Sequence, residues 1–353
     1  MSASIKLPDD IKEYIDPIDQ VQKKIRKLAE LIRNSNHVVM FTGAGVSTSA
    51  GIQDFRGPYG YLTLLKEGIQ STLADPTRTR PTRGHAAIYK LCEDGYIKHL
   101  ISQNTDGLHL RSGIPVTSIS ELHGNINIEK CPICERSYWR NSNVLKSSAE
   151  VKETHEQGRR HETVRQCENC DQVLQDTIIN CFDHAESPHQ QPLTIAQTHT
   201  KLCDLYIILG SSLIVYPANC FTQYVATRKK PVIIVNCQKT PYDDLAYIRI
   251  FAKIEDFLTL LCRELRVDLI NTEVTDLELD QSFKDMIITL NATKKLDCVK
   301  ERTAQLKMKS EHELMQILTE RCILYKPIDR IDVRREHLVN TVVKKCRNTI
   351  YWV

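Results

Sequence analysis

The sequence predicts an α/β fold in which a parallel sheet is interrupted by a small cysteine-rich module. Short apolar runs alternate with helical stretches over most of the chain, a pattern typical of strands that pair in parallel. The alternation breaks from about residue 125 to residue 183, where four cysteines stand in two pairs around a polar connector. The length of 353 residues allows two or three domains of typical size.

The chain begins with 17 residues that carry charges and two prolines, Pro8 and Pro17, and we expect a flexible lead-in there. The first helix should follow, because apolar side chains recur at helical spacing between lysines and arginines, namely Val21, Ile25, Leu28 and Ile32. Residues 37–41 then form a short apolar run that ends in glycines. Such a run is typical of a buried parallel strand that leads into a tight turn and a helix.

The later elements continue this alternation as far as residue 265. Similar apolar runs occupy residues 97–102, 205–209 and 232–235, and helical stretches occupy residues 84–93, 217–227 and 254–265. We therefore predict one α/β domain made of residues 18–124 and 190–268. Residues 125–189 should form the inserted module, and residues 269–353 a helical or partly disordered extension.

Charge and composition exclude several classes of protein. The net charge of +3 is too small for a chain whose main partner is nucleic acid. The first ten residues carry charges and a proline, whereas a secretory signal has an apolar core of roughly 7–15 residues. No stretch approaches the ~20 apolar residues that span a bilayer. We therefore expect a protein that is neither secreted nor membrane-bound, and 13 cysteines that are mostly reduced thiols.

Two CxxC pairs predict a metal site in the inserted module. The four cysteines are Cys131, Cys134, Cys167 and Cys170, with a 32-residue connector between the pairs. This spacing is typical of one tetrahedral zinc ion with four thiolate ligands, although the connector exceeds the usual 15–20 residues or so. Four protein ligands leave no open coordination position, so the ion should be structural. The alternative is two unrelated pairs of free cysteines.

A glycine-rich turn follows the first predicted strand. Gly43 and Gly45 would let the backbone approach a pyrophosphate, although a purely structural tight turn would use the same residues. Thr48 stands where a dehydrogenase would have its third glycine. The second strand ends in Gln103 and Asn104, where an NAD dehydrogenase would have an acidic residue for the ribose. These departures argue against ordinary hydride transfer.

Polar side chains gather where the predicted strands end, which is where an open α/β sheet binds ligands. They occur in residues 54–56, residues 103–106 and at His123. Each segment alone could be a turn whose polar groups are satisfied locally. Together they offer a general base, amides, carboxylates and a cation, which favours a catalytic site.

These segments resemble the sirtuin family, the NAD-dependent protein lysine deacylases. The similar stretches follow the family's order over about residues 36–266, namely residues 43–47, 51–58, 103–109, 122–124, the four cysteines, 210–213 and 235–236. Residues 56–60, 103–113 and 176–178 further resemble the class IV branch, whose members are largely nuclear, chromatin-associated or nucleolar.

The resemblance implies a Rossmann-like doubly wound parallel sheet with a small inserted zinc-binding domain of four cysteine ligands, and NAD bound between the two as a consumed co-substrate. His123 matches the catalytic base, and we expect Asn104 and Asp106 to be catalytic as well. The residues at matching cofactor-binding positions are Gly43, Ala44, Gly45, Thr48, Asp54, Phe55, Arg56, Gln103, Asn104, Asp106, His123, Gly210, Ser211, Ser212, Asn236, Gln238 and Ile254.

The leading hypothesis is therefore an NAD-dependent protein lysine deacylase, chiefly a deacetylase, acting on histone tails or other nuclear proteins. Its expected products are nicotinamide and O-acyl-ADP-ribose, and its expected location is the nucleus, with the cytoplasm as the alternative. Two other hypotheses remain open. One is NAD-dependent ADP-ribosyl transfer to protein, and the other is a catalytically weak scaffold associated with chromatin.

Three departures from the family pattern bear on these hypotheses. Gln53 replaces the usual proline and should loosen the cofactor loop, because proline restricts the backbone. Leu62 stands where class IV members often have tryptophan, and residues 178–183 lack the family's Phe-Gly-Glu. Basic clusters at residues 294–295 and 344–347 are shorter than nuclear-import runs, and a solvated helix face explains them equally well.

Overall fold

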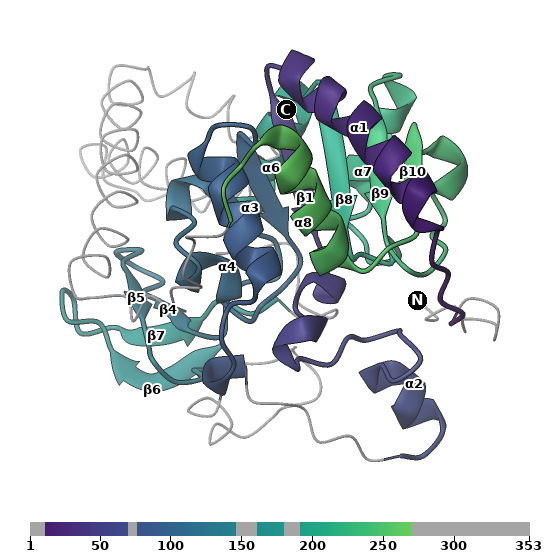
Figure 1. Ribbon diagram of the computed structural model, residues 1–353. Coiled ribbons are helices and arrows are strands. Elements are labelled where there is room, and N and C mark those ends of the chain that lie inside the picture. Colours follow the sequence, from purple (N-terminus) through teal and green to yellow (C-terminus); the bar gives the residue numbers. More distant parts are fainter. Residues whose placement is uncertain (1–10, 70–75, 146–160, 180–190, 270–353) are drawn as a thin grey trace, which may run out of the picture.

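A computed structural model describes residues 11–69, 76–145, 161–179 and 191–269, which contain two separate sheets (Figure 1). The larger sheet has six strands in the order β10-β9-β8-β1-β2-β3, and every neighbouring pair is parallel. Its strands are β1 (Val38–Thr42), β2 (His99–Ser102), β3 (Ile119–Glu121), β8 (Leu205–Leu209), β9 (Val232–Val235) and β10 (Ile248–Ile250). The predicted α/β fold with a parallel sheet is therefore confirmed.

Helices cover both faces of this sheet, because successive residues of its strands point to opposite sides. In β1, Val38 and Met40 join one apolar cluster, whereas Val39 and Phe41 join another. The first cluster is covered by α1 (Ile18–Asn34), α3 (Arg83–Glu93) and α8 (Ile254–Leu265), and the second by α6 (Gln191–Leu202) and α7 (Cys220–Thr227). The sheet is thus doubly wound, as the resemblance implies. Among the described residues, no helix combines the length and apolar character needed to cross a membrane.

The second sheet is small and antiparallel, and it lies below and to the left of the large sheet in Figure 1. Its strands are β4 (Ile128–Lys130), β5 (Ser137–Trp139), β6 (Glu162–Gln166) and β7 (Val173–Asp176), in the order β5-β4-β7-β6. The buried carboxylate of Glu129 joins its strands, because it pairs with Arg140 and Arg165 at 2.6 Å each. This sheet is the inserted module that the sequence predicts.

Short helical turns complete the described chain. They are α2 (Tyr61–Lys66), α4 (Leu108–Arg111) and the 3₁₀ turns Ala44–Val46, Thr48–Ala50, Pro76–Arg78, Val116–Ser118 and Asp243–Leu245. The glycine-rich segment after β1 therefore forms two 3₁₀ turns. The prediction of a helix directly after this segment is wrong. The chain leaves the sheet edge in tight contact with the loop after β8, since Gly45 N donates to the Gly210 carbonyl at 2.9 Å.

The lead-in also differs from the flexible segment that we expected, at least over residues 11–17. Tyr14 N donates to the Cys237 carbonyl at 2.8 Å, and Asp16 N donates to the Phe251 carbonyl at 2.8 Å. These bonds hold the segment against the loops that follow β9 and β10. The expected extension from residue 270 onward lies outside the described residues, and so do residues 180–183 of the segment that lacks the family's Phe-Gly-Glu.

Candidate active site

Apart from Ile254, which follows β10, the predicted cofactor-binding and catalytic residues follow the carboxyl ends of five parallel strands. The loop after β1 carries residues 43–48, and the loop after β2 carries residues 103–106. His123 follows β3, residues 210–212 follow β8, and residues 236–238 follow β9. Because carboxyl ends of parallel strands share one edge of the sheet, the fold brings these loops to one place.

Glycines allow the loops after β1 and β8 to touch. A Cβ at Gly43 would lie 2.7 Å from the Gly210 carbonyl oxygen, and one at Gly45 would lie 2.8 Å from Gly210 Cα. Gly210 itself has a φ of 60° and faces Gly45 just as closely. No side chain fits between these two loops, so the glycine pattern has a packing reason in addition to any contact with a ligand.

A buried polar network lies directly behind this contact. Asn104 Nδ2 donates to the Gly43 carbonyl at 3.1 Å and to Ser47 Oγ at 3.2 Å. Ser47 Oγ in turn donates to Asp106 Oδ2 at 2.7 Å, while Leu108 N donates to the other carboxylate oxygen of Asp106. The site predicted around Asn104 and Asp106 therefore includes Ser47, which lies in the glycine-rich motif and for which the sequence pattern predicts no role.

Two buried histidines support the network from the side of the core. His85 Nε2 lies 3.5 Å from Ser47 Oγ, and His109 Nε2 lies 3.0 Å from Thr42 Oγ1. Burial lowers the pKa of each of these histidines to about 3, so both are neutral at pH 7. Nothing in the sequence pattern distinguished them from ordinary core or surface histidines.

His123 has the geometry of a general base. Its Nδ1 lies 2.8 Å from the Gln103 carbonyl oxygen, which can only accept a hydrogen bond, so Nδ1 carries the proton. The Nε2 lone pair is consequently the one available to take a proton from a substrate. Burial lowers the pKa of His123 below its usual value, and the bond to Gln103 opposes this shift only in part. The imidazole is therefore neutral near pH 7.

The backbone at His123 joins the large sheet to the segment that follows the small one. Ile179 N donates to the His123 carbonyl at 3.0 Å. Gly124 has a φ of 81°, and a Cβ there would lie 1.8 Å from the Thr177 carbonyl oxygen. Any side chain at residue 124 would push these two segments apart, so the small sheet contributes directly to the position of the base.

Gln103 provides a test of whether the site suits a ligand. Its Oε1 accepts a hydrogen bond from Ser211 Oγ at 3.0 Å. Its Nε2 is buried and finds no hydrogen-bond partner within the part of the chain that the structure describes. An unsatisfied buried donor is costly, and a bound acceptor would satisfy it. The residues of the site therefore fit a polar ligand such as a dinucleotide.

The cofactor loop after the second 3₁₀ turn is held mainly by its own groups. Asp54 Oδ1 accepts from Gly57 N at 2.8 Å, and the Gln53 amide donates to the Tyr59 carbonyl. The Gln53 bond crosses the loop that we expected this residue to loosen. Phe55, a predicted cofactor contact, is 54% exposed. Ile254, the last predicted contact, is buried in the apolar core at the start of α8.

The four predicted metal ligands form one cluster. Their sulfur atoms all lie within 4.8 Å of one another. The Cys131 and Cys170 sulfurs are 3.4 Å apart, and so are those of Cys134 and Cys167. Tetrahedral zinc with Zn–S bonds of about 2.3 Å places its sulfurs about 3.8 Å apart, so the cluster fits one such ion. Four thiolates would complete the coordination, which makes the site structural.

Tyr138 adds a fifth polar group to this cluster. Its hydroxyl lies 3.1 Å from the Cys167 sulfur and accepts a hydrogen bond from Glu168 N at 3.2 Å. Burial alone would raise the pKa of the Cys167 thiol, but hydrogen bonds, led by that of Tyr138, lower it to about 6. The thiolate form that a metal requires is therefore favoured at this position.

Comparisons with known proteins agree with this geometry. Residues 66–217 match the model of the Sir2 family. A human protein named NAD-dependent protein deacetylase sirtuin-7 is 39% identical over 264 residues, which cover 73% of this chain and 64% of the relative. The Drosophila melanogaster protein named NAD-dependent protein deacetylase Sirt6 is 36% identical over 73% of this chain and 80% of its own length. The chain belongs to the Sir2 family.

A solved Sir2 structure described as a complex with a p53 peptide and NAD⁺ is similar to much of this chain. It has a TM-score of 0.53 and 29% sequence identity, and the match covers 69% of this chain and 99% of that one. The resemblance to the sirtuins that the sequence motifs carry is thus confirmed. This chain spans less than two thirds of the human sirtuin-7 relative, whose length is covered to 64%.

Proposed function

We propose that this Sir2-family protein is an NAD-dependent protein lysine deacylase, with acetyl-lysine as its main substrate. The observation that carries the proposal is the geometry of His123, which is partly buried, neutral near pH 7 and hydrogen-bonded through Nδ1 to the Gln103 carbonyl. Such an imidazole presents Nε2 as a base near pH 7. General-base assistance of this kind is typically worth about 10²–10⁴-fold in rate.

The proposed binding site for NAD⁺ runs along the carboxyl edge of the large sheet. Bound NAD⁺ would supply an electrophilic ribose carbon and the ribose hydroxyl on which the base acts. Gln103, Asn104 and Asp106 would hold the nicotinamide and its ribose, and the buried Gln103 Nε2 offers a donor for an acceptor atom there. Gly210, Ser212, Asn236, Gln238 and Ile254 would hold the adenosine end.

In the proposed reaction, the acyl group leaves the lysine nitrogen for ADP-ribose as nicotinamide departs, and one water molecule balances the equation. His123 would take the proton of the ribose hydroxyl, and Phe55 would shield the reacting centre. The substrate would be an acyl-lysine segment of a protein, such as a histone tail. An acylated lysine is uncharged, which suits a chain with a net charge of only +3.

We also propose one structural zinc ion on the four cysteines and a division into residues 18–124 with 190–268, and 125–189. The proposed location is the nucleus, and the proposed setting is chromatin. The names of the relatives support the deacetylase assignment, and the solved Sir2 complex with a p53 peptide supports a peptide substrate.

The decisive variant is His123→Ala, assayed with NAD⁺ and a panel of peptides that carry short and long acyl groups on lysine. We expect nicotinamide release to fall by about 10²–10⁴-fold, while NAD⁺ still binds and the protein stays folded. His199→Ala is a matched control. This histidine is hydrogen-bonded to His37, which precedes β1 and therefore lies at the opposite end of the sheet from His123. It should keep the wild-type rate per folded molecule.

Other results would favour the remaining hypotheses. Radiolabel from the adenine part of NAD⁺ that stays on protein would indicate ADP-ribosyl transfer. No consumption of NAD⁺ by the pure protein across the whole peptide panel would reject both enzymatic functions and leave the scaffold. An unchanged rate in His123→Ala would reject His123 as the base.

A further inference from the structure

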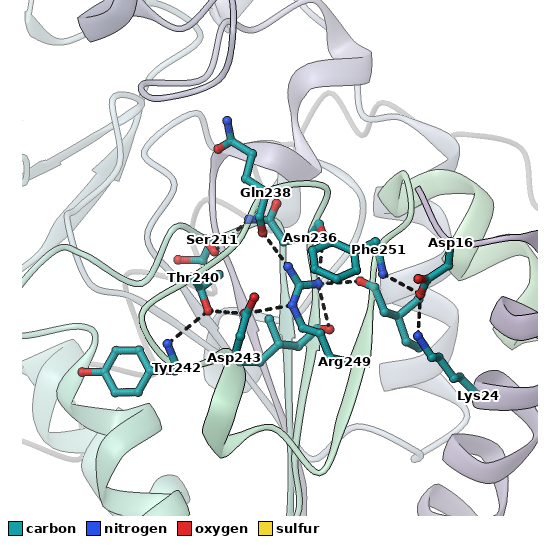
Figure 2. A network of polar contacts seen from close by, with 12 residues as sticks. Asp16, Lys24, Ser211, Asn236, Gln238, Thr240, Tyr242, Asp243, Arg249 and Phe251 are labelled. Carbon is teal, nitrogen blue, oxygen red and sulfur yellow. Dashed lines mark hydrogen bonds and ion pairs between the residues drawn. The ribbon is translucent and has the colours of Figure 1, made fainter. Parts of the chain in front are cut away.

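The guanidinium of Arg249 in β10 donates hydrogen bonds to backbone carbonyls of the loop after β9 (Figure 2). Its Nη1 donates to the Asn236 carbonyl at 2.9 Å, and its Nη2 donates to the Gln238 carbonyl at 2.5 Å. Nη1 also donates to the Ile250 carbonyl at 2.7 Å. Arg249 thus ties the backbone of β10 to two alternate residues of the neighbouring loop.

The remaining sides of the guanidinium are also occupied. Its Nε donates to Asp243 Oδ1 at 2.8 Å, and the same oxygen accepts from Thr240 Oγ1 at 2.6 Å. The ring of Phe251 lies against one face, with its centroid 3.8 Å from the guanidinium carbon. Only 12% of the Arg249 side chain is exposed. A planar group with donors in a fixed fork suits this arrangement, whereas a lysine ammonium could not reach three directions in one plane.

The two carbonyls that Arg249 holds belong to residues that we assign to the adenosine end of NAD⁺. The side chains of these residues reach other loops of the site. Asn236 Nδ2 donates to the Ser211 carbonyl at 3.4 Å, and Gln238 Nε2 donates to the Arg56 carbonyl at 3.2 Å. Arg249 therefore fixes the backbone from which both side chains extend, although it lies behind that loop.

The segment before α1 supports the same loop from outside. Gln238 Nε2 also donates to the Ile11 carbonyl at 3.1 Å, and Glu13 pairs with Gln238 as an antiparallel bridge. Farther along, Asp16 Oδ2 accepts from Phe251 N at 3.0 Å and from Lys24 Nζ at 2.6 Å (Figure 2). The loop after β9 thus lies between this segment and β10, so its position depends on both.

We propose that Arg249 is a positioning residue for NAD⁺, which sets the affinity of the adenosine end without touching the reacting atoms. This inference rests on the proposed function. Loss of the guanidinium leaves the Asn236 and Gln238 carbonyls without their donor and the carboxylate of Asp243 without its cation. Hydrogen bonds to charged groups and buried ion pairs are the contacts whose one-sided removal is most costly. The loop would then shift away from its binding position, while His123 and its surroundings stay in place.

The test measures NAD⁺ and ADP-ribose binding by direct titration, together with the KM for NAD⁺, the KM for an acetyl-lysine peptide and kcat. For Arg249→Lys, we expect the Kd for both dinucleotides and the KM for NAD⁺ to rise about tenfold or more. The kcat at saturating NAD⁺ and the KM for peptide should stay within about threefold, because the reacting end of the site is untouched. A merely structural role would lower the folded fraction, but it would not raise the Kd and KM for NAD⁺ while leaving kcat and the KM for peptide unchanged.

Two further variants keep the outcome decisive. Arg228→Lys is the matched control, because this arginine lies over the Tyr224 ring at the end of α7, and it should leave NAD⁺ binding unchanged. Asp243→Asn weakens the hold on the guanidinium and should raise the Kd for NAD⁺ by a smaller factor, and it decides the question if Arg249→Lys does not fold.

The results separate the two proposals. Wild-type protein that fails to bind NAD⁺ would overturn the proposed function. Wild-type protein that binds NAD⁺, together with folded Arg249 or Asp243 variants that bind it equally well, would overturn only the role of Arg249. A fall in kcat with no change in the Kd for NAD⁺ would overturn that role as well.

Discussion

The two sheets of this protein are stabilised in different ways. In the large parallel sheet, strands such as β1 and β8 are buried along their whole length between two layers of helices. In the small antiparallel sheet, Val164 and Val173 are 61% and 42% exposed. Its apolar cluster consists of Tyr138, Leu174 and the four metal-site cysteines. The large sheet is thus stabilised chiefly by apolar burial. Ile128 and Trp139 of the small sheet join the larger apolar cluster, but we infer that the rest of this sheet depends on a metal ion held by the four cysteines.

This difference matters because the proposed catalytic base lies where the two regions meet. The His123 side chain is oriented by the Gln103 carbonyl, which belongs to the large domain. Its backbone carbonyl is bonded to Ile179 N, just after the last strand of the small sheet. The large domain thus fixes the tautomer of the base, and the region of the small sheet supports its backbone. Perturbing each region separately tests this division.

Metal removal should have the largest effect, and only in one region. Structural zinc in small domains contributes roughly 10–16 kcal/mol of apparent binding free energy. We expect a strong chelator, or the Cys167→Ser substitution, to abolish amide-exchange protection in β4 and β7 while β1 and β8 stay protected. Cys220→Ser is the matched control, because Cys220 is exposed and outside the cluster. Equal loss of protection in both sheets would contradict the division.

A cavity in the large core should have the next largest effect. Phe257 of α8 is fully buried in the larger apolar cluster. Phe257→Ala should lower the free energy of unfolding by about 3–5 kcal/mol, measured by urea denaturation. Leu245→Ala, at a position that is 51% exposed, should change it by about 0.5 kcal/mol at most. Zinc content should be unchanged in both variants, and loss of zinc from folded Phe257→Ala would show that the regions are coupled more tightly than we infer.

Tyr138 allows a milder test of the small sheet. Tyr138→Phe removes the hydroxyl that contacts the Cys167 sulfur at 3.1 Å but keeps the ring in the core. Partners of metal ligands typically contribute about 10–100-fold in metal affinity. We expect a loss of zinc affinity in that range in competition with a chromophoric chelator. Tyr89→Phe, which removes a hydroxyl bonded to Glu93 on α3, should leave zinc affinity unchanged.

Acid should weaken the large region gradually through its buried histidines. Burial lowers the pKa of His85, His99 and His109 to about 3, whereas an unfolded histidine has a pKa of about 6.5. The unfolded state therefore binds more protons below pH 6.5, and stability must fall as the pH falls from about 6.5 towards 3. Each histidine contributes about 1.4 kcal/mol per pH unit in that range.

This pH dependence can be measured by urea denaturation between pH 7.5 and 5.5. The contribution of these three histidines to the free energy of unfolding should be nearly constant down to about pH 6.5. Below that pH it should decline. His99→Gln should make the decline shallower by about 1.4 kcal/mol per pH unit, because it removes one of the three protonation steps. A slope that is the same in wild type and variant would rule out His99 as a contributor.

The sequence predicts the elements of the large domain best where a short stretch of residues determines the structure by itself. Uninterrupted apolar runs identify β1, β8 and β9, because a strand buried on both faces has no polar alternation. The strands β3 and β10 have only three residues each, too few for any period to be visible. The segment after β1 is not a helix, because its glycines serve the contact with Gly210. Such contacts between distant loops cannot be read from a local pattern.

The candidate site shows the same limit. The four cysteines reveal their cluster through spacing alone, and the motifs around Asn104 and His123 place those residues through family resemblance. The roles of Ser47, His85 and Arg249 depend on which segments meet in space, so no local signal indicated them. The structure also adds the tautomer of His123, because that depends on a carbonyl 20 residues away in the chain.

The proposed reaction transfers an acyl group from lysine to ADP-ribose with His123 as the base. The most direct measurement is the stoichiometry of the products, by mass spectrometry, after incubation with NAD⁺ and an acetyl-lysine peptide. We predict one nicotinamide and one O-acetyl-ADP-ribose for each peptide deacetylated, and formation of both products that is about 10²–10⁴-fold slower with His123→Ala. Deacetylated peptide without O-acetyl-ADP-ribose, or equal amounts of product from His123→Ala and wild type, would contradict the proposed reaction.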